Sequence, residues 1–309
     1  MTFDLDRHVR YHRVRTVFLC VTFLLTIAAT IATLAGWHGL LYDPNEKQGL
    51  VAWLMDGDKL FWILGIVAIG QYAIRNAMGR QLLKQQAHPR EYPELYAMLD
   101  DLSRKAGLKR RPRLCVVSGR QANAFAFGLS ERLGAVVLNH GILYRLTPEQ
   151  IHAVMAHEMT HLTNRDSKLF AVLDTLLGVL GFQAKITSLL LTFTLVLMFI
   201  SNTPWTDLTF IVGAMVILGV GRLIAAMQRN VISQSREYLA DAGAIRLLGN
   251  GGQLALALHH IGLVHGDILT RNQRGGLLDF ILHCLRTHPP TRKRMFVLLG
   301  GQEPYFGMF

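Results

Sequence analysis

Residues 16–37, TVFLCVTFLLTIAATIATLAGW, form a stretch of 22 residues without a charged side chain. As a helix that rises about 1.5 Å per residue, this stretch is long enough to cross a hydrocarbon core about 30 Å thick. The apolar part of a cleavable signal peptide is shorter, about 7–15 residues, so an uncut anchor is favoured although small residues at 33–35 could accommodate a cleavage site. The stretch therefore predicts an integral membrane protein.

The composition of the whole chain agrees with a membrane protein. Hydrophobic residues make up 51% of the 309 residues and charged residues only 17%, which is too apolar for an ordinary soluble protein. Further membrane spans are expected at residues 59–78, 186–200 and 208–227. The first of these three is the weakest, because its uncharged core, residues 60–74, is short for a bilayer.

Basic residues flank the apolar stretches unevenly, and the formal net charge is +11. They precede the first span and follow the second: Arg7, Arg10, Arg13, Arg15, Arg75, Arg80, Lys84 and Arg90. The polar break between the last two spans, SNTPWTD, contains no Lys or Arg. Because cytoplasmic loops are rich in Lys and Arg, this pattern predicts four spans with both termini in the cytoplasm. Membrane topology therefore accounts for most of the positive charge, and no nucleic-acid partner is needed to explain it.

A region of soluble character lies between the second and third spans. Residues 91–108 have the apolar spacing of an amphipathic helix, and the segments PRLCVVSG, NAFAFG and GAVVLN each read as a short strand. The cysteines, Cys20, Cys115 and Cys284, include no C-x-x-C pair. They therefore predict neither a disulfide framework nor a zinc-thiolate site.

The most informative segment is residues 147–166, TPEQIHAVMAHEMTHLTNRD. Thr147 and Gln150 form a T-x-x-Q capping box, which marks the start of a helix. On that helix His157 and His161 are four residues apart, so both imidazoles lie on one face and can share one metal ion. Glu158 projects beside them.

This arrangement is the H-E-x-x-H signature of zinc proteases. Zinc binds neutral imidazole nitrogens and keeps one position open for water, whose pKa it lowers towards about 7. A carboxylate such as Glu158 can then accept the proton of that water. The alternative is an amphipathic helix with surface histidines that match the pattern by chance.

A catalytic zinc ion needs a third protein ligand. The extended form of the motif would require Gly and His where the chain has Asn164 and Ser167, so it is excluded. Downstream, the segment SREYLADAGA offers Glu237 and Asp241 one helical turn apart. The intervening pair of spans should return the chain to the same membrane face, which would bring Glu237 to the histidines. The alternative is that both acids are merely exposed on a helix.

With these motifs the sequence resembles the HtpX-type integral-membrane zinc metalloproteases of bacteria. These belong to the gluzincins and are related to the zinc-dependent prenyl-protein endopeptidases. The resemblance implies one Zn²⁺ per chain bound by His157, His161 and Glu237. It implies that Glu158 is the general base and that Asp241 orients a ligand histidine from outside.

The resemblance also assigns roles to two other segments. Asn123, Ala124 and Phe125 match an edge strand thought to pair with extended substrate. His288, in THPPTRKR, is a candidate to stabilise the tetrahedral oxyanion, although a histidine before Pro289 and Pro290 could only order the turn.

The expected fold is a mainly α-helical membrane protein with four transmembrane helices and an α+β zincin-like catalytic domain containing a small sheet. Residues 1–79 would form an N-terminal membrane region, 80–175 the first part of the catalytic domain, 176–228 a transmembrane hairpin and 229–309 the second part. The resemblance implies a zinc endopeptidase of the bacterial inner membrane that acts in quality control, with its active site in the cytoplasm. Its partners would be polypeptides, mainly membrane proteins, and the lipid bilayer.

Two rival interpretations make different predictions. A non-catalytic zinc-binding scaffold or chaperone would normally close its metal site with four protein ligands, whereas the sequence offers three. A nucleic-acid binder would interleave a basic face with aromatic residues. The best candidate for such a face, RKAGLKRRPR, contains no aromatic residue and suits anionic lipid headgroups better.

Overall fold

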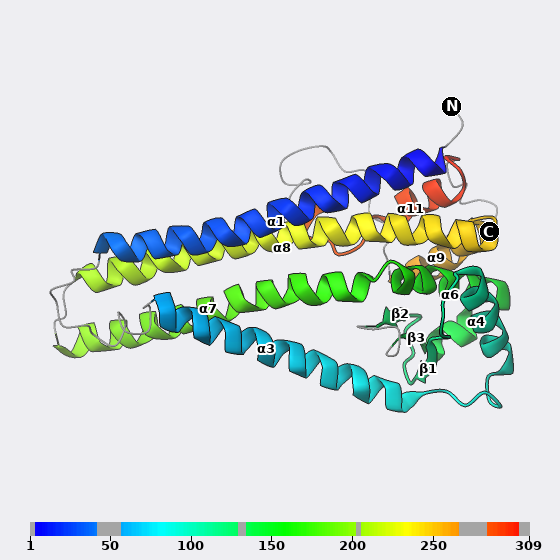
Figure 1. Ribbon diagram of the computed structural model, residues 1–309, viewed down its shortest axis with the longest axis horizontal. Helices are drawn as coiled ribbons and strands as arrows, with labels where there is room; N and C mark the ends of the chain where they lie inside the picture. Colours follow the sequence, from blue (N-terminus) through cyan, green and yellow to red (C-terminus); the bar gives the residue numbers. More distant parts are fainter. Residues whose placement is uncertain (1–3, 42–56, 129–133, 202–204, 266–282, 303–309) are drawn as a thin grey trace. The chain divides into compact units, whose positions relative to one another are not determined.

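The structure is a computed structural model, which describes residues 4–41, 57–128, 134–201, 205–265 and 283–302 (Figure 1). Most of these residues are helical. In chain order the elements are α1 (Leu5–Leu41), α3 (Gly57–Leu82), the short 3-10 helix η1 (Leu83–Gln85), α4 (Pro93–Lys105), β1 (Arg113–Val117), β2 (Ala124–Phe127), β3 (Ala135–Asn139), α5 (His140–Arg145), α6 (Pro148–Thr163), α7 (Asp166–Ser201), α8 (Trp205–Leu248), α9 (Gly252–His265) and α11 (Thr291–Leu298).

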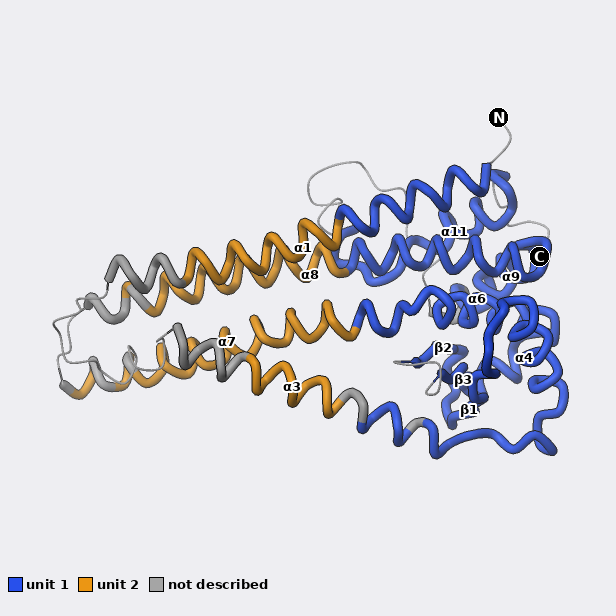
Figure 2. The backbone as a smooth tube through the Cα atoms, viewed as in Figure 1, with its two compact units in different colours: residues 1–18, 76–170, 230–309 blue, residues 19–75, 171–229 orange. Residues whose placement is uncertain are grey.

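The chain divides into two compact units (Figure 2). Unit 1 comprises Met1–Phe18, Asn76–Phe170 and Asn230–Phe309, and unit 2 comprises Leu19–Arg75 and Ala171–Arg229. Helices α1, α7 and α8 each contribute residues to both units. The four-part division expected from the sequence stays a prediction.

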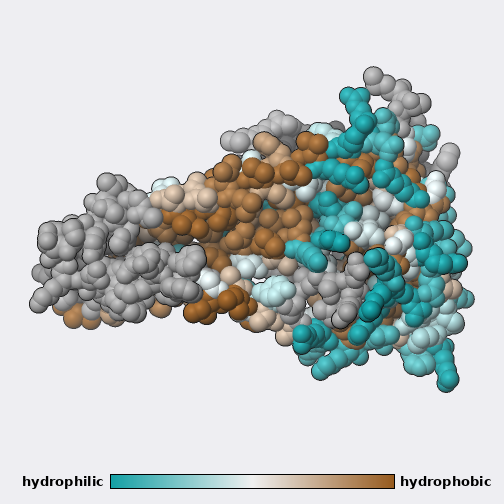
Figure 3. Space-filling view, in the orientation of Figure 1, coloured by the Kyte–Doolittle hydropathy of each residue, from teal (hydrophilic) through white to brown (hydrophobic). Residues whose placement is uncertain are grey.

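Three helices are long and apolar enough to cross a membrane. The qualifying stretches are Leu5–Leu34 in α1, Asp166–Phe193 in α7 and Ile211–Leu248 in α8. Hydrophobic side chains cover much of the visible surface of these helices in unit 2 (Figure 3), and Phe199 of α7 is 93% exposed. Within the described part of the chain α3 does not qualify, so the second span and the total of four stay predictions.

Close helix contacts hold unit 2 together. A Cβ atom on Gly221 of α8 would lie only 2.1 Å from Oγ1 of Thr30 in α1, so the two helices meet at a point where a larger residue would not fit. Nearby in α8, Arg229 donates a 2.8 Å hydrogen bond from Nε to Asp174 of α7. Small residues and paired charges are typical of helices that associate within a bilayer.

Unit 1 contains the small sheet expected from the sequence. Its strand order is β1-β3-β2, and the central strand β3 is parallel to β1 and antiparallel to β2. Val137 of β3 lies between Cys115 of β1 and Phe125 of β2. Residues 135–138, the apolar run AVVL, are buried throughout, as expected for a strand covered on both faces.

Helix α6 packs on this sheet and is held from several sides. It contacts β2 and β3 and also α4 and α9, while α9 contacts α11. The shared apolar core includes Leu99, Leu102, Leu114, Leu138, Met155 and Met159, all of which are fully buried. A helix that is packed on so many elements is a rigid support for side chains that must hold fixed positions.

Both ends of α6 are sharply defined. The predicted capping box is present: the Gln150 amide N–H donates to Thr147 Oγ1 (3.4 Å), and the Thr147 amide N–H donates to Gln150 Oε1 (3.2 Å). The helix ends at Thr163, and Arg165 then adopts φ = +57° before α7 begins at Asp166. Positive φ is costly for a residue with a side chain, so this turn is a specific feature of the fold.

Candidate metal centre

Three side chains from two helices converge in unit 1. His157 Nε2 and His161 Nε2, both from α6, are 3.1 Å apart. From α8, the carboxylate of Glu237 reaches both rings, with 3.5 Å between Oε2 and His157 Nε2 and 3.7 Å between Oε1 and His161 Nε2. The structure thus brings together the three residues that the sequence suggested as ligands, and one ligand atom from each lies within 4.8 Å of the others.

This geometry fits a divalent transition metal. Ligand atoms placed tetrahedrally about 2.0–2.2 Å from zinc are roughly 3.3–3.6 Å from one another, close to the observed separations. Two imidazoles and one carboxylate are a donor set that zinc accepts, and three protein ligands leave one tetrahedral position free, as in catalytic sites. The group can therefore hold a metal ion.

Glu158 follows the first of these histidines on α6 and lies about 100° further around the helix axis. Its side chain is only 7% exposed. Within the described parts of the chain, no Lys, Arg or His lies within ion-pair distance of its carboxylate. Glu158 is thus a buried acid beside the candidate ligands, and among the described residues it has no positively charged partner.

Asp166 contacts the second candidate ligand histidine from behind. Its Oδ2 lies 2.7 Å from Nδ1 of His161, the ring nitrogen that faces away from the other ligands. Asp166 is buried and also forms an ion pair with Arg236, which in turn donates to the carbonyl of Asn164. A carboxylate behind a ligand histidine fixes the tautomer and the orientation of the ring. Sequence reasoning did not identify Asp166, although it ends the same quoted segment as His161.

Asp241 occupies the corresponding place behind the first ligand histidine. Its Oδ1 lies 3.0 Å from Nδ1 of His157, but the ring N–H is not aligned with it, so the contact is electrostatic. Burial alone would lower the pKa of His157, yet the carboxylates of Asp241 and Glu237 outweigh it and raise this pKa to about 10. The surroundings therefore favour positive charge at the place where a metal ion would supply it.

Arg294 connects the two carboxylates of α8. Its Nη1 lies 2.9 Å from Glu237 Oε2, while its Nε and Nη2 donate to the two oxygens of Asp241 at 2.8 and 2.7 Å. All three side chains are buried. No sequence pattern distinguishes Arg294 from the other two basic residues of TRKR, because only the packing of α11 shows which of the three faces inward.

The remaining candidates lie at the margin of the centre. His288 is 63% exposed, and its Nδ1 lies 3.3 Å from Glu237 Oε1. Ala124 and Phe125 belong to β2, and Asn123 just before it accepts a 2.9 Å hydrogen bond at its carbonyl from Asn139. Among the strands described, β2 pairs only with β3. Its outer edge thus has no partner strand among the described elements.

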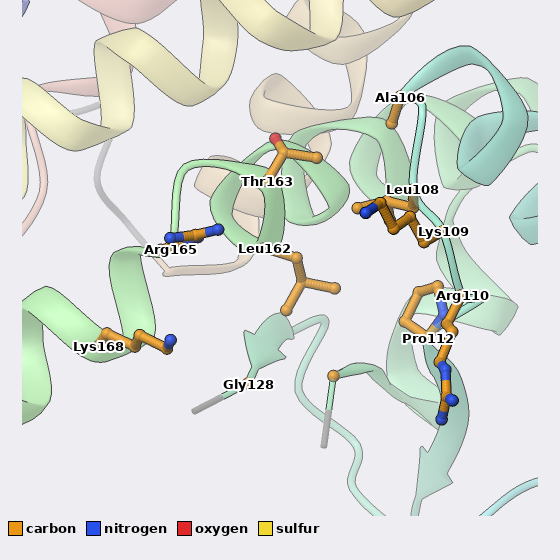
Figure 4. Close-up of a pocket in the computed structure, with 11 residues that line it drawn as sticks. Ala106, Leu108, Lys109, Arg110, Pro112, Gly128, Leu162, Thr163, Arg165 and Lys168 are labelled. Carbon is orange, nitrogen blue, oxygen red and sulfur yellow. The ribbon is translucent and has the colours of Figure 1, made fainter. Parts of the chain in front are cut away.

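A cavity of about 550 Å³ adjoins the helix that carries the histidines (Figure 4). Leu162 projects into it, with Lys109 and Arg110 on one side and Arg165 and Lys168 on the other. Among the described residues that line it, none is a His, Cys, Asp or Glu. Its charge suits anionic groups rather than a metal ion.

Comparison with known proteins gives consistent matches. Residues 89–300 match peptidase family M48. A protease HtpX homolog of Trichormus variabilis is 31% identical over 295 residues, which cover 87% of this chain and 94% of that protein. A protease HtpX homolog of Bacteroides fragilis is 26% identical over 313 residues, which cover 91% and 92% of the two chains.

The fold is also similar to a solved structure. The crystal structure of S. mikatae Ste24p superposes with a TM-score of 0.52 over 93% of this chain and 66% of that chain, at 15% sequence identity. At this identity the likeness concerns the fold alone.

Proposed function

We propose, on the premise that this chain belongs to peptidase family M48, that it is a membrane-bound zinc endopeptidase acting on membrane-associated or misfolded membrane proteins. The family expected from the sequence is confirmed, and with it the chain is a metalloprotease. The metal, the residue roles, the substrates and the membrane face are the proposal. The convergence of His157, His161 and Glu237 supports it most strongly.

His157, His161 and Glu237 would hold the ion. Zinc, when bound, polarises a carbonyl group and lowers the pKa of water. Glu158 accepts the proton of the attacking water and delivers it to the leaving amine, which a buried carboxylate without a basic partner is suited to do. Asp166 and Asp241 keep the imidazoles in place from behind.

His288 is placed to donate a hydrogen bond to the oxyanion that forms when water attacks the peptide bond. Its ring is largely exposed, yet its Nδ1 is within 3.3 Å of a candidate ligand, so the ring can face both substrate and metal centre. A donor aimed at developing negative charge lowers the barrier of acyl transfer.

The substrate would bind as an extended strand along the outer edge of β2. Main-chain hydrogen bonds to residues 123–125 would position it while adding little sequence preference. The support is that β2 is an edge strand among the described elements and contacts α6, which carries the catalytic carboxylate. Such binding suits an enzyme that removes damaged proteins of many sequences.

The membrane assignment rests on the apolar stretches of α1, α7 and α8. α8 carries both such a stretch and Glu237, which supports cleavage close to a bilayer. The basic residues before the first span and after the expected second span support an active site on the cytoplasmic side of the bacterial inner membrane.

A peptidase assay on the full chain in detergent, with unfolded casein as the substrate, tests the proposal. Glu158→Gln should abolish cleavage and still bind one zinc ion per chain. Glu237→Ala should lose both zinc and cleavage. Glu149→Gln, an exposed acid at the start of the same helix, is the matched control and should resemble the unmodified chain. Cleavage by Glu158→Gln at the normal rate would exclude the assigned base.

Native substrates can be sought with the same variant. Membranes that contain the Glu158→Gln chain should accumulate intact proteins that membranes with the active chain degrade. If the two sets of membrane proteins are identical under conditions that damage membrane proteins, the assigned substrate class is wrong.

A further inference from the structure

A second cavity in unit 1 lies between the start of α1 and the helices α8 and α11, and none of the three candidate metal ligands lines it. Its volume is about 570 Å³. The side chains that matter for its chemistry are Tyr11, Arg15, Tyr238, Arg292, Lys293 and Phe296. Sequence motifs gave no role to this combination of residues.

The cavity is positively charged. Arg15, Arg292 and Lys293 line it, and within the described ranges neither Arg15 nor Lys293 has a carboxylate within ion-pair distance. The pKa of His283 indicates the same positive potential. It is lowered first by burial and then by the positive charges of Lys293, Arg15 and Arg286. An anion that entered the cavity would therefore meet Arg15 and Lys293, two cations that no acidic side chain of the described residues neutralises.

Its walls are also aromatic and apolar. His12 stacks on Tyr238 with ring centroids 4.6 Å apart and forms one wall. Tyr11 is 61% exposed and Phe296 is 37% exposed. A phosphate or sulfate ion would contact only the basic side chains. A ligand with an anionic head and an apolar tail would contact both the basic side chains and the apolar walls.

The position of Arg15 in the chain relates the cavity to the bilayer. Arg15 is the last charged residue before the uncharged stretch 16–37, and both belong to the single helix α1. When that stretch spans the hydrocarbon core, Arg15 lies just outside it, at the depth of lipid headgroups.

We propose that this cavity binds an anionic phospholipid, with the headgroup phosphate at Arg15 and Lys293 and the upper acyl chain against Phe296. The site is separate from the peptidase chemistry, so the Glu158→Gln variant should bind the same lipid. Binding should also not depend on zinc.

The test uses the full Glu158→Gln chain in a neutral detergent, with binding followed by native mass spectrometry. The three probes are dioctanoyl phosphatidylglycerol, dioctanoyl phosphatidylcholine and inorganic phosphate. Arg15→Gln combined with Lys293→Gln removes two cavity cations. Arg10→Gln combined with Arg104→Gln removes two exposed cations elsewhere and is matched in net charge.

We expect saturable binding of phosphatidylglycerol that weakens at least tenfold in the cavity variant and is unchanged in the control variant. Equal binding of phosphatidylcholine, or unchanged binding by the cavity variant, would overturn the proposal. If inorganic phosphate binds as tightly as the lipid and is lost in the same variant, the ligand is a free anion and the lipid assignment is wrong. Should the double variant fold poorly, as judged by its melting temperature, Lys293→Gln alone should weaken binding at least threefold, and an unchanged affinity would again exclude the site.

Discussion

His161 Nδ1 lies 2.7 Å from Asp166 Oδ2, and the two residues can meet only because the helix breaks between them. In a continuous helix, a residue five positions further on points about 140° away around the axis. The positive φ of Arg165 ends α6 and turns the chain, so that the first residue of α7 faces back towards the ring. The local strain at Arg165 is thus tied to the orientation of a candidate metal ligand.

Asp166→Asn should weaken zinc binding about 10- to 100-fold, the usual effect of removing a carboxylate behind a ligand histidine. Competition with a chromophoric chelator measures the affinity directly. Asp100→Asn, which removes an exposed partner of Arg111, is the control and should leave the affinity unchanged. Equal zinc affinity in both variants would show that Asp166 does not support the ligand.

Arg294→Met should destabilise the metal-free protein by about 3–5 kcal/mol, because the buried carboxylates of Glu237 and Asp241 would lose their shared positive partner. The loss of stability should be smaller in the zinc-loaded protein, because the ion balances part of the negative charge of the two carboxylates. Denaturant unfolding with and without zinc gives both values. The control Arg111→Gln breaks an exposed ion pair and should cost at most about 1 kcal/mol.

Gly243→Ala should destabilise unit 1 by about 1–3 kcal/mol through overpacking. A Cβ atom on Gly243 would lie 2.2 Å from Cγ2 of Thr160, where α8 crosses the helix that carries the histidines. Adding Thr160→Gly should recover part of the loss in thermal unfolding. Gly219→Ala in the same helix meets nothing within 4 Å, so it should be neutral or stabilising. Equal melting temperatures for Gly243→Ala and Gly219→Ala would contradict the close contact.

His288→Ala should lower kcat about 100- to 1,000-fold with zinc retained, if its imidazole stabilises the oxyanion. His88→Ala, at an exposed histidine remote in sequence, should have no such effect. A normal kcat in His288→Ala would leave this histidine with only the turn-ordering role that its proline neighbours suggest.

The parts of the site that follow from local geometry were predictable from the sequence. The spacing of His157 and His161 fixes their common face on any helix, and the Thr147–Gln150 capping box fixes where that helix begins. The contact with Asp166 was not predictable from periodicity, because it requires a helix break at a residue other than glycine. The position of Arg294 depends on how α11 packs against α8. Arg294 lies 53 residues after its partner Asp241 in the chain, so no local sequence pattern predicts their contact.

The membrane helices show a similar limit. Hydropathy located apolar stretches at 186–200 and 208–227, but α7 and α8 are much longer than either. A charged residue interrupts an apolar stretch of sequence, but the helix itself can continue through it. Arg229 and Asp174 satisfy each other's charge across the two helices, so the backbone continues where the apolar pattern stops.

The uninterrupted course of α7 and α8 has a practical consequence. α7 begins with Asp166, and α8 carries Glu237 on the same helix as an apolar stretch. A fragment that keeps Asp166 and Glu237 but omits most of the apolar residues of α7 and α8 would require a cut within both helices. The candidate ligand Glu237 and the apolar residues before it thus belong to one continuous helix.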